Sequence, residues 1–286
     1  MDTNHEAVEA APTPVPSRPP PPARSECVTI REDAGPVMLM DLSYYIFYRY
    51  YALLAWYRKS DTVLDDDEGF LRRFERLFVS SLMKVCKGLG IPPGRMYMVG
   101  DCPRWRIWRM DLLTTYKSNR ENRQKVKPGV FELVYTKILP GLREKHGTQF
   151  LCVDGAEADD VIGWIHRHSP NVDKTIITND HDYLQLKDDR TRILNMHMVD
   201  ICRKGTGCPR KDLQMKILTG DVSDNIAAVM SKKRASVYVA MPFEEMIKQL
   251  REDGYMDRYR ENERLVDMRL IPENIHEAIR VRVSIV

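Results

Sequence analysis

Long apolar runs and a marked excess of one charge are both missing from this sequence of 286 residues. Because no run of about 18 apolar residues occurs, the sequence predicts no membrane-spanning helix and no membrane partner. The net charge is only +3, so the molecule as a whole is not a polycation. Any surface for a charged partner must therefore come from local clustering of charges.

A disulfide framework is missing as well. The six cysteines have no framework spacing, and no signal peptide precedes them. His197, Cys202 and Cys208 do not have the spacing of a standard zinc site. These absences indicate an intracellular protein in a reducing compartment.

Apolar residues are scarce in the first 35 positions, where seven of the 17 prolines fall between Pro12 and Pro22. Such composition predicts a disordered or polyproline-like tail over residues 1–35. We expect one catalytic domain over residues 36–211 and a smaller helical region over residues 212–286, helical to its end.

Apolar runs alternate with helical patterns between these limits. Strands are predicted at 37–40, 95–99, 149–153, 174–178 and 192–195, and helices at 42–57, 70–89, 130–145 and 156–168. This alternation predicts an α/β fold with a central, mainly parallel sheet and helices on both faces.

Carboxylates follow several of the predicted strands or begin the next helix. Because the carboxyl ends of parallel strands meet at one edge of a sheet, we expect these side chains to gather there. Like charges at close range raise one another's pKa, so cations must neutralise them. Carboxylate oxygens favour Mg²⁺ or Mn²⁺, and such clusters usually act on phosphates. The nine residues are Asp41, Asp101, Glu157, Asp159, Asp160, Asp180, Asp182, Asp221 and Asp224. The alternative is a purely structural role, because acids also stabilise helix N-termini without any metal.

A basic stripe runs from Arg104 to Lys127, with eight Lys/Arg residues against two acids. Three aromatic residues, Trp105, Trp108 and Tyr116, are interleaved with it. This pattern favours a basic arch at about residues 102–128 that faces a polyanion. A solvated helix face is the alternative.

Five segments, in this order and spacing, resemble the motifs of the flap endonuclease / 5′–3′ exonuclease superfamily. The resemblance covers residue 37 to about residue 272. Its segments are Tyr116 to Arg120, Glu157 to Asp160, Thr178 to Leu186, Leu218 to Ile226 and Tyr259 to Pro272. It implies a PIN-like nuclease fold followed by a helix–hairpin–helix-type region.

The resemblance also implies roles for individual residues. Two Mg²⁺ or Mn²⁺ ions would be held by the carboxylates, the first by Asp41, Asp101, Glu157, Asp159 and Asp160 and the second by the other four. Lys117, Arg120 and Arg109 would draw the scissile phosphate to the metals. Phe47 would stack on a base near the cut, although core packing is an equal alternative in so aromatic a helix. The candidate DNA contacts are Phe47, Arg49, Tyr116, Lys232, Lys233 and Arg234.

One segment departs from the family pattern. The family's hairpin glycines, which seat duplex phosphate and a monovalent cation, are replaced here by Ala228, Ser231 and Lys233. Without glycine the backbone approaches a phosphate less easily. Side-chain charge on Lys232, Lys233 and Arg234 is the expected substitute, with a grip that depends on salt.

The sequence thus predicts a monomeric, divalent-metal-dependent, structure-specific 5′ nuclease acting in replication, repair or recombination. Its expected partners are DNA with a 5′ flap, nicked or gapped duplex, and single-stranded 5′ ends. One alternative is an RNA-cleaving PIN-like nuclease. Another is a catalytically inactive DNA-binding protein, which the presence of all nine carboxylates argues against.

Overall fold

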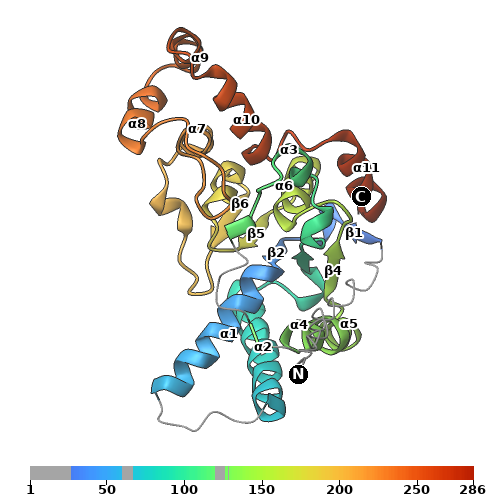
Figure 1. Cartoon of the computed structure of the whole chain (residues 1–286). Helices are drawn as coiled ribbons and strands as arrows, with labels where there is room; N and C mark the ends of the chain where they lie inside the picture. Colours follow the sequence, from blue (N-terminus) through green and yellow to red (C-terminus); the bar gives the residue numbers. More distant parts are fainter. Residues whose placement is uncertain (1–26, 60–66, 120–125, 128) are drawn as a thin grey trace, which may run out of the picture.

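A five-stranded parallel sheet forms the centre of the molecule (Figure 1). The computed structural model describes residues 27–59, 67–119, 126–127 and 129–286. The strands run in the order β4-β3-β2-β5-β6. Their bounds are β2 Val37–Asp41, β3 Met96–Gly100, β4 Gln149–Cys152, β5 Lys174–Ile177 and β6 Thr191–Leu194. The predicted α/β class and its five strands are confirmed.

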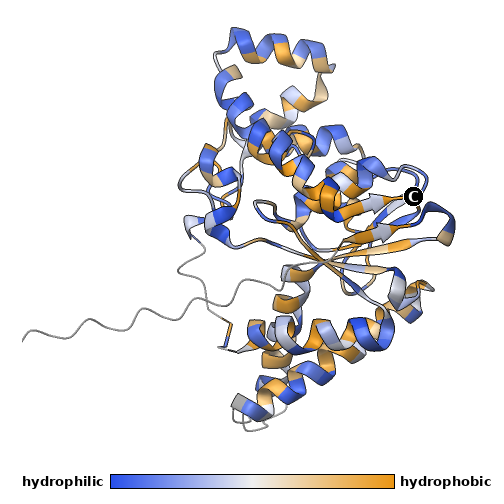
Figure 2. Cartoon of the chain, turned by 90° about the vertical axis from the view of Figure 1, so that its right-hand side faces the viewer, coloured by the Kyte–Doolittle hydropathy of each residue, from blue (hydrophilic) through white to orange (hydrophobic). Residues whose placement is uncertain are grey.

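The sheet is covered on both faces because alternate residues of its strands are apolar in both directions. Leu39 and Val99 belong to one core cluster, together with Val161 of helix α6 (Ala158–His168). Met40 and Met98 belong to the other, which contains α1 (Leu42–Lys59) and α2 (Asp67–Leu89). Figure 2 shows apolar residues gathered in the strands and on the helix faces that pack against them.

Short helices connect these layers. The 3-10 helix η3 (Arg104–Arg106) and helix α3 (Arg109–Leu112) follow β3. The predicted helix at 130–145 consists of α4 (Val130–Leu133) and α5 (Leu139–His146), joined through a π-helical segment. The 3-10 helix η6 (His181–Leu186) follows β5.

The C-terminal region is helical, as predicted. Its helices are α7 (Pro209–Thr219), α8 (Lys232–Ala240), α9 (Phe243–Glu252), α10 (Met256–Val266) and α11 (Glu273–Arg282). A third core cluster joins Ile107 and Tyr116 to Ile217 of α7, Tyr238 of α8 and Leu265 of α10. This cluster ties the basic stripe to the C-terminal helices.

The two ends of the described chain pair with each other, which the sequence did not predict. Strand β1 (Val28–Ile30) lies parallel to β7 (Val283–Ile285), with Val28 opposite Val283. Ile30 is fully buried. The predicted tail is therefore wrong for residues 28–30, and the C-terminal region does not stay helical to its end. The reason is that β1 is stabilised by a strand far along the chain, so local composition gives no sign of it. Within the described residues, no helix has the length and apolar character needed to cross a bilayer.

Candidate metal centre

Eight carboxylates line one cavity of about 480 Å³ at the carboxyl ends of the parallel strands. We call it the acidic cavity. Its carboxylates are Asp41, Asp101, Glu157, Asp159, Asp180, Asp182, Asp221 and Asp224. Asp160, the ninth predicted ligand, does not line it.

Asp41 and Asp101 sit at the ends of neighbouring strands β2 and β3. The backbone N–H of Tyr44 donates to Asp41 Oδ1 at 2.9 Å. Asp101 accepts from Ser43 Oγ at 2.7 Å and from the N–H of Ala158, in the first turn of α6, at 2.8 Å. These bonds fix both carboxylates before any ligand arrives.

Asp180 and Asp182 lie at the start of η6, directly after β5. Asp180 caps η6, because its Oδ1 accepts from the N–H of Asp182 at 3.0 Å. The hydroxyl of Thr178 accepts from the N–H of Asp180 at 3.1 Å and lies 3.5 Å from Asp41 Oδ2. Thr178 therefore links the ends of two adjacent strands.

Asp221 and Asp224 belong to a tight loop after α7. Asp221 and Ile226 exchange two backbone hydrogen bonds, at 2.9 and 2.8 Å. Gly220 begins the loop with φ +65°, and a Cβ there would lie 2.5 Å from the carbonyl oxygen of Ile226. Only glycine fits this turn, which turns both carboxylates into the cavity.

Crowding perturbs the acids of this cavity. Burial, followed by the charge of Asp101, raises the pKa of Asp41 to about 7. Burial and Asp180 raise the pKa of Asp182 to about 7. Burial likewise raises the pKa of Asp159 well above its usual range. Carboxylates in this state need a cation to ionise together.

The sequence predicted Arg109 to be part of a basic stripe that faces a polyanion, and this is wrong. Arg109 is buried, with 1% of its surface exposed. Its guanidinium donates to both oxygens of Asp160 at 2.8 and 2.9 Å, to Glu157 Oε2 at 2.8 Å and to the carbonyl of Leu265 at 2.8 Å. Asp160 also accepts from Trp108 Nε1 and from the N–H of Glu157. Both oxygens of Asp160 are therefore occupied by protein donors, so this geometry makes Arg109 and Asp160 an internal ion pair that fixes the start of α6.

Tyr116 is also buried rather than open to DNA. Its hydroxyl donates to Glu157 Oε2 at 2.9 Å and lies 3.3 Å from Asp224 Oδ2. The next residue, Lys117, lines the acidic cavity, pairs with Glu157 and lies 3.7 Å from Asp224. Lys117 has φ 55°, a left-handed conformation that a non-glycine residue adopts at a cost of about 1–2 kcal/mol. Its N–H donates to the carbonyl of Asp224 at 2.9 Å, which holds it there.

Lys216 of α7 is a residue that the sequence reasoning missed. Its Nζ lies 2.5 Å from Asp182 Oδ1 and 2.5 Å from Asp221 Oδ2. Nothing in the pattern of α7 singles it out, because a lysine on a surface helix is ordinary. Its spacing of five residues before Asp221 is the only signal in the sequence.

The remaining predicted residues are spread over different surroundings. Phe47 lines the acidic cavity, is 40% exposed and stacks on Tyr51, with ring centroids 6.4 Å apart. Arg49 is half-buried and turned toward Ser81 of α2, outside the cavity. Arg120 lies outside the described residues.

In the hairpin segment, two backbone N–H groups and one of the three basic side chains are bonded within the protein. The N–H groups of Val229 and Met230 both donate to the carbonyl of Leu218, at 2.9 and 3.1 Å. Arg234 is bound to Tyr255 Oη at 2.7 Å and to Asp253 at 3.1 Å. Lys232 and Lys233 are exposed at the start of α8. Three basic side chains of this segment were predicted to contact DNA. Among the described residues, Arg234 has a carboxylate partner and the two lysines have none.

The donor set fits divalent cations. Oxygens of Asp182, Asp221 and Asp224 lie within 4.8 Å of one another, as do those of Glu157, Asp159 and Asp160. Ligands that share one Mg²⁺ lie up to about 4.2 Å apart, so small side-chain shifts would close the first cluster, or Glu157 and Asp159 of the second, around an ion. Two acidic clusters able to bind divalent metals are thus present. The lysines at 117 and 216 lie among the same carboxylates in the structure.

Comparisons with known proteins point in the same direction. A family model described as 5′-3′ exonuclease, N-terminal resolvase-like domain, matches residues 36–208. A protein named 5′-3′ exonuclease from Buchnera aphidicola is 27% identical over 205 residues, which are 68% of this chain and 66% of that protein. The Ribonuclease H of Enterobacteria phage T4 is 29% identical over 238 residues, 74% of this chain and 77% of that protein.

The fold has a close parallel among solved structures. A flap endonuclease of bacteriophage T5, crystallised with DNA and metal ions, superposes with a TM-score of 0.61. It covers 85% of this chain and 96% of its own, at 17% identity. Since the matched family model spans most of the sheet and its carboxylates, the chain belongs to the 5′–3′ exonuclease family.

Proposed function

We propose that this chain is a divalent-metal-dependent, structure-specific 5′ nuclease that hydrolyses DNA phosphodiesters. One observation carries the proposal: eight carboxylates from five separate segments line a single cavity, with Lys117 and Lys216 among them. A structural role for acids at helix N-termini does not explain this convergence, because such acids face their own helix and not one another.

The proposed division of the ligands is the one that the family resemblance implies, without Asp160. Asp41, Asp101, Glu157 and Asp159 would hold one ion, and Asp180, Asp182, Asp221 and Asp224 the second. Such ions supply an activated water and stabilise the leaving oxygen. Asp160 is left out of both sets, because its oxygens are bound to Arg109, Trp108 and Glu157.

The chain's own residues bind and orient the substrate. Lys117, which lines the cavity and pairs with Glu157, is proposed to contact the scissile phosphate, since it is a compact point charge on a flexible stem next to the ligand sites. Tyr116 holds Glu157 in place from behind. The face of Phe47, extended by Tyr51, offers a platform on which a base at the cut can stack.

DNA as substrate is supported by the T5 flap endonuclease, which was crystallised with DNA and metal ions. RNA cleavage is the second candidate, because the phage T4 relative is named a ribonuclease. Cleavage is measured on labelled 5′-flap, blunt duplex and single-stranded DNA with Mg²⁺, beside a flap whose single strand is RNA. Faster cleavage of the DNA flap supports the proposal, whereas preference for the RNA flap selects the second candidate. No cleavage of any substrate with either Mg²⁺ or Mn²⁺ contradicts both.

A further inference from the structure

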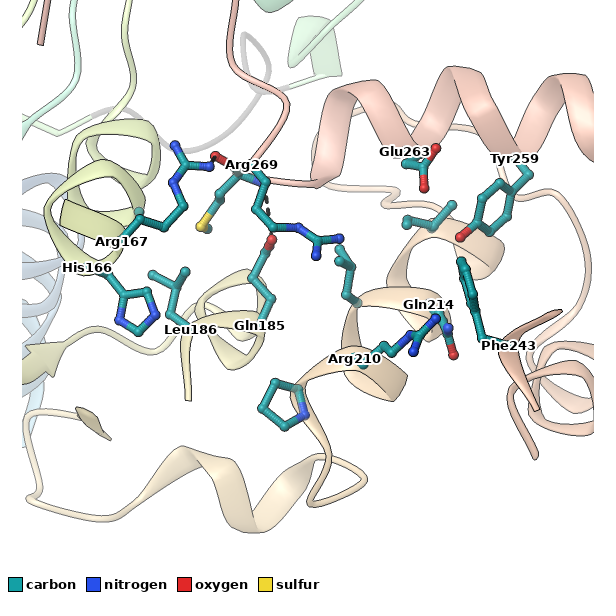
Figure 3. A pocket seen from close by; sticks show the side chains of 15 residues that line it. His166, Arg167, Gln185, Leu186, Arg210, Gln214, Phe243, Tyr259, Glu263 and Arg269 are labelled. Atoms are coloured by element: carbon teal, nitrogen blue, oxygen red, sulfur yellow. Dashed lines mark hydrogen bonds between the residues drawn. The ribbon is translucent and has the colours of Figure 1, made fainter. Parts of the chain in front are cut away.

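A second cavity lies on the other side of the elements that build the acidic cavity. It has a volume of about 470 Å³, similar to that of the acidic cavity. Helix α7 contributes Lys216 to the acidic cavity and Gln214 to this one, and η6 contributes Asp182 and Gln185 in the same way. We call it the α7–α10 cavity, because Tyr259 and Glu263 of α10 form its opposite wall (Figure 3).

Gln214 presents its amide to this cavity. Gln214 is 5% exposed, and its side chain makes no hydrogen bond to any residue that the structure describes. Figure 3 shows it beside Arg210, at the end of the cavity next to Phe243. The amide therefore keeps both a donor and an acceptor for a ligand in the cavity.

Three arginines line this cavity, with Arg210 beside the amide and Arg167 at the other end (Figure 3). The guanidinium of Arg210 lies 3.8 Å from the ring centroid of Phe243 and has no carboxylate partner in the described part of the chain. Arg167 uses one N–H on the carbonyl of Met268, and burial lowers its pKa against the opposing charges of Asp267 and Asp160. Arg269 is held by Asp267.

Glu263 is the one carboxylate among the residues that line the cavity, against three arginines. Burial, followed by the charge of Asp267, raises the pKa of Glu263. The cavity therefore offers an amide with two-sided hydrogen-bonding capacity, an arginine stacked on an aromatic ring and a second arginine with donors to spare.

We propose that the α7–α10 cavity binds a nucleotide, with the base edge on Gln214 and the phosphate on the arginine at 210. A glutamine amide can bond a base edge through its donor and acceptor together, and guanidinium groups bind phosphate in a forked geometry. The volume lies in the range of about 300–1,000 Å³ that is typical of small-ligand sites. The nucleotide can be free or can be the terminal unit of a strand. The proposal does not depend on the nuclease activity.

Equilibrium binding to the full chain tests it, with AMP, adenosine, inorganic phosphate and a short single-stranded oligonucleotide as probes. EDTA is present throughout, so that the carboxylates of the acidic cavity repel phosphate instead of binding it through a metal. We expect AMP to bind more tightly than adenosine or phosphate. Gln214→Leu should weaken AMP about tenfold and leave phosphate unchanged, because it removes one base contact. Arg210→Met should weaken both.

Two control variants separate this site from the acidic cavity. Arg203→Met removes an exposed arginine outside the cavity and should bind AMP like the unaltered chain. Asp182→Asn, in the acidic cavity, should do the same. Thermal unfolding checks that each variant is folded. If Gln214→Leu is not folded, Gln214→Glu takes its place, because it keeps the shape of the side chain but repels phosphate.

Three results overturn the proposal. Phosphate that binds as tightly as AMP would show a simple anion site. Binding that becomes tighter in Asp182→Asn but does not change in either cavity variant would place AMP in the acidic cavity. AMP that fails to saturate at about 5 mM would show no site of useful affinity. Competition by the oligonucleotide supports the proposal and identifies a strand end as the source, whereas AMP binding without such competition supports it with a free nucleotide.

Discussion

Arg109 and Asp160 form a two-bonded ion pair at the start of α6, with both side chains shut off from solvent. Arg109→Met would leave the Asp160 carboxylate buried without its partner. We expect the free energy of unfolding to fall by about 3–5 kcal/mol, measured by urea denaturation.

The pair offers its own controls. Adding Asp160→Asn to Arg109→Met should restore part of the loss, because it removes the stranded charge. Arg280→Met breaks an exposed pair with Glu277 and should leave the free energy of unfolding nearly unchanged. If Arg109→Met lowers the free energy of unfolding no more than Arg280→Met does, the buried pair does not stabilise the fold as proposed.

Asp182→Asn should abolish cleavage and leave DNA binding unchanged or tighter. The substitution removes a proposed metal ligand and also one negative charge that repels the phosphates. Single-turnover cleavage at saturating Mg²⁺ and DNA binding in Ca²⁺ measure the two effects. Cleavage at the rate of the unaltered chain would remove Asp182 from the ligand set.

Lys117→Met should lower the turnover rate by about 10²–10³-fold with little change in affinity. A group that acts on the phosphate in the transition state contributes there more than in the ground state. Lys127→Met is the matched control, because that ammonium lies over the ring of Phe70, 4.8 Å from its centroid. An effect of Lys117→Met confined to KM would make it a docking residue.

The hairpin lysines should account for the salt dependence of duplex binding. Replacing Lys232 and Lys233 by alanine is expected to flatten the slope of log K against log salt by up to about 0.9 per lost phosphate contact. Arg234→Ala should leave the slope unchanged, since its guanidinium is bound to Asp253. Equal slopes for the double variant and the unaltered chain would show that this segment does not touch the duplex.

Asp41 and Asp182 should make the metal-free protein less stable as the pH rises from about 4 to about 7. The quantity that falls is their contribution to the free energy of unfolding. Both have a pKa of about 7 in the folded chain, against an ordinary value of 3.8. The folded state therefore binds more protons than the unfolded state in this window, and deprotonation destabilises it. Mg²⁺ should then raise the melting temperature more at pH 8 than at pH 5.5. Asn at both positions should remove this difference, and a stabilisation by Mg²⁺ that does not change with pH would contradict the assignment.

The strands and the positions of the carboxylates could be predicted because both depend on local pattern. Buried parallel strands are continuous apolar runs, and the acids that follow them meet at one edge whatever the strand order. The partners of the acids could not be predicted in this way. Arg104, Arg106 and Arg109 look alike in the stripe, yet Arg106 pairs with Asp154 at the surface while Arg109 is buried.

What separates these arginines is contact with distant residues. The bond from Arg109 to the carbonyl of Leu265 joins positions 156 apart in sequence. Lys216 likewise reaches the acids through the packing of α7 on η6. A stripe of charge therefore predicts a basic surface, and only tertiary packing decides which of its members turn inward.

The pairing of β1 with β7 sets an order on how the chain can be completed. Val28 lies opposite Val283, so β1 has no partner until nearly the whole sequence has been synthesised. Contacts this far apart form late, because a long loop must close before they stabilise anything. We therefore expect the parallel sheet to assemble first, with the small two-stranded sheet acting as a latch that closes last on the finished core.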